Sequence, residues 1–274
     1  MRGSCACSYE HGPRAGNKGD VWKHFLLLTV LDGLLLQRNP QEGPFRYLET
    51  HCGKGLQVLG KEGGWRQGIG RLAPIPLALS THPYFQLASP PGGSGGVYLG
   101  SWLLVALHLQ SLGIEFQMHL YDVSPEVKKY FCCLGASGSP KSPIVFLPED
   151  GFQAVRSTET WDLVLVDPPF YPDAEKDKLE CSRLPALLER RCRAFLIWYP
   201  LSSEQEPSFD LARGHQALEI IWEKRKGSSM AGCGVMLGGR ADLVQEDLFP
   251  QLELLAERLG AMFRWKKGMK EGPS

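Results

Sequence analysis

The chain has 274 residues, of which 43% are hydrophobic, and its 30 basic residues balance its 30 acidic ones. This length allows one large or two small domains with a substantial core, and the neutral total argues against tight, sequence-independent nucleic-acid binding, which depends on neutralised phosphates. No segment approaches the ~20 apolar residues of a membrane span, and early polar residues interrupt any signal peptide, so we expect a soluble, cytoplasmic protein.

Apolar runs and glycine- or proline-rich turns alternate along the chain. We expect a helix within residues 13–36, with an apolar stripe made of Val21, Phe25, Leu28 and Leu31. Strands are expected at residues 45–50, 115–121, 144–147, 163–166 and 194–199, followed by an antiparallel pair at 218–224 and 233–237. This alternation predicts an α/β, Rossmann-like fold with a doubly wound, mostly parallel sheet and an antiparallel final strand.

Two further features concern the connections. Ser124 and Pro125 follow the second expected strand, and they predict a helix with Ser124 as its N-cap. Residues 60–100 contain many glycines and prolines and break the alternation. We expect a single domain over residues 1–274 that carries an inserted loop or small subdomain at residues 60–100.

Eight cysteines raise the question of disulfides or a metal site. The sequence has no Cys-x-x-Cys pair, and Cys5 and Cys7 have no second pair at the spacing of a zinc site. We therefore expect reduced thiols and no bound metal. The cysteines are Cys5, Cys7, Cys52, Cys132, Cys133, Cys181, Cys192 and Cys233.

The most informative segment is WDLVLVDPPF at residues 161–170. Prolines cannot donate ladder hydrogen bonds, so the strand ends there and Asp167 lies at its carboxyl end, where open α/β sheets bind ligands. Asp167 and the Pro168 carbonyl only accept hydrogen bonds, so they can hold both hydrogens of a planar amine such as adenine N6. Phe170 can stack on the base. The alternative is a plain strand-to-turn stop.

Acidic residues end three successive expected strands, namely Asp122, Asp150 and Asp167. A glycine turn at residues 51–55 follows the first strand. In nucleotide-type sites such a turn approaches the ligand closely, and the acids that follow accept hydrogen bonds from ribose hydroxyls and from an adenine amine. Because the turn lacks the full Gly-x-Gly-x-x-Gly spacing of a dinucleotide site, we expect S-adenosylmethionine as the cofactor.

These motifs resemble the RlmJ family of bacterial adenine-N6 methyltransferases of 23S, large-subunit ribosomal RNA. The most specific match is RAGNKGDVWKH at residues 14–24, and further matches are THCGKG at 50–55, EDGFQ at 149–153 and WYP at 198–200. The similarity runs over about residues 9–237. The resemblance implies a Rossmann-like methyltransferase domain with a small inserted helical subdomain.

The resemblance also implies a set of site residues, with Asp167 in the catalytic position. The implied methyl-donor contacts are His24, His51, Ser101, Asp122, Asp150 and Gly151, and Lys23 matches a lysine next to the donor-binding histidine. From the glycine turn we also expect Gly53 to bind the cofactor, together with Lys23. For the two histidines the alternative is helix packing or capping, and Ser101 is also interpreted as the N-cap of a helix.

The chain departs from the family pattern at four places. Phe170 replaces the commoner tyrosine, which keeps the stack and loses a hydroxyl. Asp122 stands where a longer glutamate is usual, and Lys54 stands between glycines where a small residue is usual. From Gly238 onward the Pro-Pro-Trp-like segment of the family is missing.

The sequence therefore favours a methyltransferase that acts on adenine N6 in ribosomal RNA, as a monomer without membrane or metal. One alternative is a DNA adenine or protein glutamine methyltransferase, which use the same motif. Another is a noncatalytic RNA-binding assembly factor that retains the cofactor fold. The Asp167 carboxylate argues against this second alternative.

Overall fold

The computed structural model describes residues 14–39, 41–90, 96–134, 143–157, 159–170, 174–202, 215–224, 230–240 and 244–268. The helices are α1 (Lys18–Leu36), α2 (Leu77–Ser80), α3 (Pro83–Leu87), α4 (Ser101–Ser111), α5 (Pro125–Cys133), α6 (Gly151–Val155), α7 (Ala174–Arg183), α8 (Pro185–Leu188) and α9 (Phe249–Arg258). The strands are β1 (Phe45–Glu49), β2 (Leu56–Val58), β3 (Val97–Leu99), β4 (Phe116–Tyr121), β5 (Ile144–Leu147), β6 (Trp161–Val166), β7 (Cys192–Leu201), β8 (Gln216–Ile221), β9 (Gly232–Gly239) and β10 (Met262–Lys267). The short 3₁₀ helices are η2 (Gly64–Gln67), η3 (Ile69–Leu72) and η6 (Glu246–Leu248).

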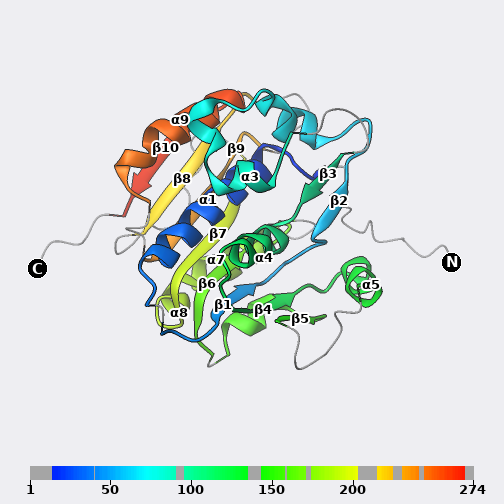
Figure 1. The fold of residues 1–274 in the computed structure, drawn as a ribbon, viewed down its shortest axis with the longest axis vertical. Helices are drawn as coiled ribbons and strands as arrows, with labels where there is room; N and C mark the ends of the chain where they lie inside the picture. Colours follow the sequence, from blue (N-terminus) through cyan, green and yellow to red (C-terminus); the bar gives the residue numbers. More distant parts are fainter. Residues whose placement is uncertain are drawn as a thin grey trace, which may run out of the picture.

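A central sheet has the strand order β10-β8-β9-β7-β6-β1-β4-β5 (Figure 1). The strands β1, β4, β5, β6 and β7 pair in parallel, while β9 lies antiparallel between β7 and β8. The predicted doubly wound, mostly parallel sheet is confirmed, together with the antiparallel pair near its end. The chain adds an edge strand that the sequence did not predict, since β10 pairs antiparallel with β8. Its charged sequence MFRWKK suits a partly solvated sheet edge and hides the usual strand pattern.

The parallel strands bring the predicted acids to one edge. Strand β6 pairs with β1, β1 with β4, and β4 with β5, all in parallel. Asp122 follows β4, Asp150 follows β5 and Asp167 follows β6. Their backbone positions therefore share the carboxyl edge of the sheet, which is where ligands bind in this architecture.

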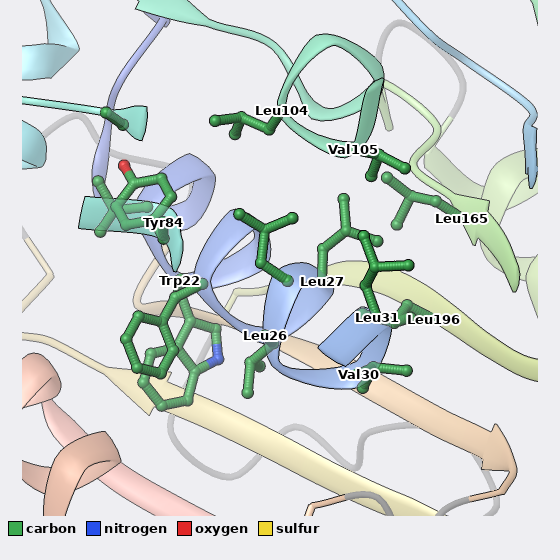
Figure 2. Close-up of a cluster of buried hydrophobic side chains, with 14 of the residues drawn as sticks. Trp22, Leu26, Leu27, Val30, Leu31, Tyr84, Leu104, Val105, Leu165 and Leu196 are labelled. Carbon is green, nitrogen blue, oxygen red and sulfur yellow. The ribbon is translucent and has the colours of Figure 1, made fainter. Parts of the chain in front are cut away.

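Helix α1 is buried on nearly all sides. The expected helix is confirmed, and all four residues of its expected apolar stripe are buried. Burial extends beyond this stripe, because Leu26 and Leu27 lie off it and are fully buried as well. The helix contacts β7 and β9 of the sheet on one side and α3 and α4 on the other. A helix covered on every side has no solvated face and shows no amphipathic period. Figure 2 shows this cluster around Trp22, Leu26, Leu27, Val30, Leu31, Tyr84, Leu104, Val105, Leu165 and Leu196.

The segment at residues 60–100 forms short elements, where the structure describes it. They are η2, η3, α2, α3 and β3, and β3 pairs with β2 in a separate two-stranded sheet. Helix α3 packs on α1 and α4. The single domain over residues 1–274 with an insertion at 60–100 stays a proposal.

Two smaller expectations have outcomes here. Ser124 occupies the N-cap position of α5 and Pro125 follows it, but the Ser124 side chain makes no capping hydrogen bond. The six described cysteines, which are Cys52, Cys132, Cys133, Cys181, Cys192 and Cys233, are free thiols. Cys5 and Cys7 lie outside the described residues.

The burial of α1 can be tested with two leucines on the same helix. Leu27 is fully buried, whereas Leu36 is 88% exposed. We expect Leu27→Ala to lower the free energy of unfolding by about 2–5 kcal/mol, since it leaves a cavity. The matched control Leu36→Ala should change it by less than about 0.5 kcal/mol. Urea denaturation measures both, and equal effects would contradict the burial of α1.

Candidate functional site

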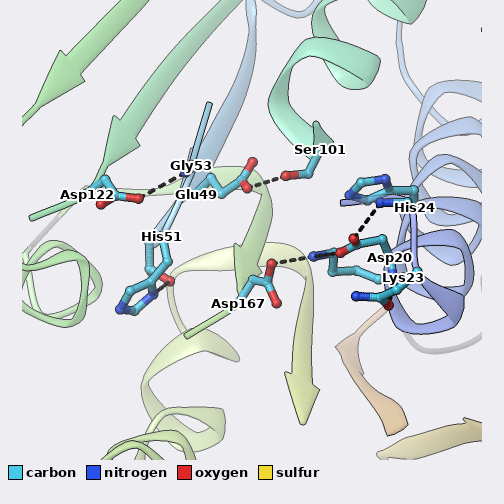
Figure 3. Close-up of polar contacts among 12 residues, drawn as sticks. Asp20, Lys23, His24, Glu49, His51, Gly53, Ser101, Asp122 and Asp167 are labelled. Carbon is cyan, nitrogen blue, oxygen red and sulfur yellow. Dashed lines mark hydrogen bonds and ion pairs between the residues drawn. The ribbon is translucent and has the colours of Figure 1, made fainter. Parts of the chain in front are cut away.

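A buried ion pair joins α1 to the end of β6. The Lys23 ammonium contacts the Asp167 carboxylate and lies 3.4 Å from an oxygen of Asp20 (Figure 3). Burial by itself would lower the pKa of Lys23, but the carboxylates of Asp167 and Asp20 outweigh it, so the pKa is raised. Lys23 is therefore charged at neutral pH and fixes one oxygen of Asp167.

The residues after Asp167 leave β6 and form a segment without regular secondary structure. Pro168 is buried, Pro169 is exposed, and neither has a backbone N–H to continue the ladder. Phe170 has a φ of +50°, in the left-handed region that non-glycine residues rarely adopt. Its N–H donates to Asp177 Oδ2 at 3.0 Å, and its ring centroid lies 5.7 Å from that of Trp198. The aromatic ring is thus held next to the end of β6.

A buried carboxyl group also lies at the end of β1. Glu49 is fully buried and accepts hydrogen bonds from the Ser101 hydroxyl and, at 2.7 Å, from the Tyr47 hydroxyl. Burial raises the pKa of Glu49 to about 8. Ser101 was expected as an N-cap, which is wrong: Gly100 caps α4, and Ser101 is the first helical residue. Its hydroxyl donates to Glu49 instead of capping the helix.

The glycine turn after β1 is tied to Asp122. The two Asp122 oxygens accept backbone hydrogen bonds from Gly53 at 3.0 Å and Ser124 at 2.8 Å. Gly53 has a φ of +59°, and a Cβ atom there would meet nothing within 4 Å. Gly55 has no such room, because a Cβ would lie 2.2 Å from the Trp102 ring. The turn is therefore packed against α4 at Gly55 and open at Gly53.

His51, Asp150 and Gly151 lie where β1 meets α6. Burial lowers the pKa of His51 to about 4, and the ring packs edge-on against Phe152. Asp150 caps α6 by accepting from the Phe152 N–H at 2.9 Å. Gly151 has no room for a side chain, since a Cβ would lie 2.0 Å from the Thr50 carbonyl oxygen. Neutral His51 and the Asp150 carboxylate thus face the same edge.

His24 has a packing role in this structure. It is buried, its Nδ1 lies 3.0 Å from the Tyr98 hydroxyl, and the two rings stack with centroids 5.6 Å apart. The Tyr98 hydroxyl also lies 3.1 Å from that of Tyr84. These contacts agree with the helix-packing interpretation and leave a donor contact of His24 as a proposal.

Most of the sequence-predicted site residues surround one region (Figure 3). The labelled predicted members are Lys23, His24, His51, Gly53, Ser101, Asp122 and Asp167. Sequence reasoning missed Asp20, Glu49 and Asp177. Glu49 carried a usable signal, because it is the acid that ends an apolar strand directly before the glycine turn. Asp20 lies three residues before Lys23 on α1 and accepts from the Gly16 N–H at 3.0 Å, and Asp177 lies seven residues after Phe170, but neither spacing by itself indicates a site residue.

Within the described part of the chain, no group of three or more His, Cys, Asp and Glu side chains could hold a metal ion. No described helix is both long enough and apolar enough to span a membrane.

Comparison with known proteins supports the resemblance. The chain is 29% identical to ribosomal RNA large subunit methyltransferase J of Haemophilus influenzae, over 73% of this chain and 72% of the relative. The Escherichia coli protein of the same name is 25% identical over the same shares. A Legionella pneumophila protein of known structure superimposes with a TM-score of 0.69 at 19% identity, covering 94% of this chain and 99% of that one, and this likeness shows the fold. No protein-family model matches the chain. The two named relatives confirm the resemblance to the RlmJ family.

The buried Glu49 predicts a pH dependence of stability. Its pKa rises from 4.5 in the unfolded chain to about 8. Between these values the folded protein holds a proton that the unfolded chain has lost, so the free energy of unfolding falls as pH rises, by at most about 1.4 kcal/mol per pH unit. Glu49→Gln should remove this contribution, and so gain stability relative to the parent between about pH 5 and pH 8.

Urea denaturation at several pH values measures the effect. Glu126→Gln is the control, because Glu126 is exposed and forms a surface ion pair with Lys54. Its stability should follow the parent curve with a constant offset. If the free energy of unfolding changes with pH in the same way for Glu49→Gln and the parent, the pKa of Glu49 is not raised by folding.

Proposed function

We propose that this protein transfers a methyl group from S-adenosylmethionine to the N6 amine of an adenine in large-subunit ribosomal RNA. The observation that carries the proposal is Asp167, held by Lys23 at the carboxyl end of β6 and followed by Pro168 and Phe170. The names of the two relatives support ribosomal RNA as the substrate. We further propose that the protein acts in the cytoplasm as a monomer.

The residues at the carboxyl edge fit a nucleoside-type donor. The open space at Gly53 lets a ligand approach the backbone, as glycines do in nucleotide sites. Asp122 and Asp150 can each accept further hydrogen bonds, since a carboxylate has about four lone-pair sites and each already accepts from backbone. Ser101, neutral His51 and Gly151 complete the proposed donor side, with Lys23 and His24 beside it on α1.

The proposed chemistry requires little of the protein beyond positioning. When bound, S-adenosylmethionine supplies an electrophilic methyl group. Asp167 uses one oxygen for Lys23, and its other oxygen points away from that contact (Figure 3). This second oxygen and the Pro168 carbonyl can accept the two amine hydrogens, which would orient the nitrogen lone pair toward the donor. As the nitrogen–methyl bond formed, the methyl–sulfur bond of the donor would break and S-adenosylhomocysteine would leave. The amine then loses a proton to Asp167 or to solvent.

Phe170 and Trp198 supply the aromatic side of the proposed base pocket. An adenine must leave its stack to be methylated, and aromatic rings can replace the lost stacking. Phe170 is 9% exposed, and the base would stack on this accessible part of its ring.

Asp167→Asn tests the amine contact. The amide keeps the size of the side chain but introduces a donor, and it loses the charge that pairs with Lys23. Methyl transfer should collapse while S-adenosylmethionine still binds. Radiolabelled transfer to unmodified ribosomal RNA, DNA and release factor, with calorimetry of donor binding, measures both effects and separates the alternative substrates. Turnover at the parent rate on RNA would refute the proposed mechanism, and transfer to no substrate would favour a noncatalytic assembly factor.

Phe170 provides an independent test of the base contact. We expect Phe170→Ala to cost about 1–3 kcal/mol of base stacking, seen as a loss of kcat/KM for RNA. Phe170→Tyr should stay active because the ring is kept. If Phe170→Ala is as active as the parent, the residues after Asp167 only end the strand and Phe170 does not contact the substrate.

Asp122 tests the donor side. Asp122→Ala should weaken S-adenosylmethionine binding by about 1–3 kcal/mol, because it leaves hydrogen-bond donors unpaired in a partly buried site. Asp122→Asn is the control, since its carbonyl oxygen still accepts one hydrogen bond. Calorimetry that gives the same affinity for all three proteins would remove Asp122 from the donor site.

A further inference from the structure

The backbone of Phe170 is held by a side chain from another element. Beyond β6 the chain no longer pairs with β7, and the two preceding residues are prolines, so the N–H of Phe170 has no ladder partner. Asp177 on α7 accepts this N–H at 3.0 Å. A partly buried backbone donor that loses its partner is costly, so this contact stabilises the left-handed conformation of Phe170.

Helix α7 is itself fixed to the core. Cys181 lies one turn after Asp177 on the same helix face, and it is fully buried in the hydrophobic cluster that also contains Phe170. Leu184, directly after α7, is fully buried in the same cluster. Asp177 therefore belongs to a helix that is packed against the core, and this packing fixes the position of the carboxylate that accepts the Phe170 N–H.

The position of the Phe170 ring follows from its backbone. With φ at +50° the Cβ direction differs from that of an extended residue, and here it places the ring 5.7 Å from Trp198. An extended Phe170 would send its side chain elsewhere. The contact with Asp177 thus sets where an aromatic surface stands relative to Asp167.

We propose that Asp177 is a positioning residue, which holds the segment at residues 167–170 in the conformation that presents Phe170 to the target base. This inference rests on the proposed function. In it Asp177 contacts no substrate and acts through the Phe170 backbone. The inference therefore predicts an effect on turnover of RNA with no effect on the methyl donor.

Three variants on α7 test the proposal. Asp177→Ala removes the acceptor, while Asp177→Asn keeps a carbonyl oxygen that can accept the Phe170 N–H. Glu180→Ala is the matched control, because Glu180 lies on the same helix and contacts Arg156 at the surface. We expect Asp177→Ala to lower kcat for RNA by about tenfold with an unchanged donor Kd, as expected for the loss of one hydrogen bond to a charged group. Asp177→Asn and Glu180→Ala should stay within about threefold of the parent.

Amide hydrogen exchange of Phe170 gives a readout that does not depend on activity. The Phe170 amide should be protected in the parent and in Asp177→Asn, and should lose protection in Asp177→Ala. Parent-like turnover and parent-like protection in Asp177→Ala would overturn the proposal. If Asp177→Ala does not fold, an unprotected Phe170 amide in the parent overturns it instead. A parent protein that methylates no RNA refutes the proposed function, while the exchange data still decide whether Asp177 holds Phe170.

Discussion

The buried contact between Lys23 and Asp167 is the constraint on which the rest of the site depends. A buried ammonium is stable only with partners, and Lys23 finds them in Asp167 and Asp20. The pair therefore fixes the angle of α1 over the sheet, because a shift of the helix would leave a charge unpaired. It also selects one orientation of the Asp167 carboxylate. The same contact therefore holds α1 against the sheet and orients the carboxylate of the proposed chemistry. This double role explains why α1, which lies in the core, contains Lys23.

The ionised groups around this contact sum to a net negative charge. Asp20 and Asp167 supply two carboxylates against the one ammonium of Lys23, and Glu49, with its pKa at about 8, holds a proton at neutral pH. Burial and the nearby Asp167 both raise the pKa of Glu49, so a further negative charge is avoided where it would be most costly. Asp122 and Asp150 add negative charge at the rim. The region as a whole thus favours a cationic ligand over an anionic one.

Much of the sheet and of its acidic edge could be predicted from the sequence, because buried parallel strands are unbroken apolar runs and prolines mark where β6 ends. What could not be predicted depends on contacts between distant residues. The bond from Lys23 crosses 144 positions to Asp167. The burial of α1 beyond its apolar stripe depends on which helices cover it. Ser101 lies one residue inside α4 and donates to Glu49, which is 52 positions away in the sequence. The edge strand β10 was missed because its residues are charged.

The two sides of the site are built by different means. On the proposed donor side, Asp122 and Asp150 accept hydrogen bonds from the backbone of their own turns, so local chain geometry orients them. On the proposed amine side, Asp167 and Phe170 are oriented by side chains of α1 and α7. Asp122 and Asp150 are thus oriented within their own turns, whereas Asp167 and Phe170 also require α1 and α7 to be in place. A movement of α7 alone would therefore change the position of Phe170 and leave the proposed donor contacts of Asp122 and Asp150 intact.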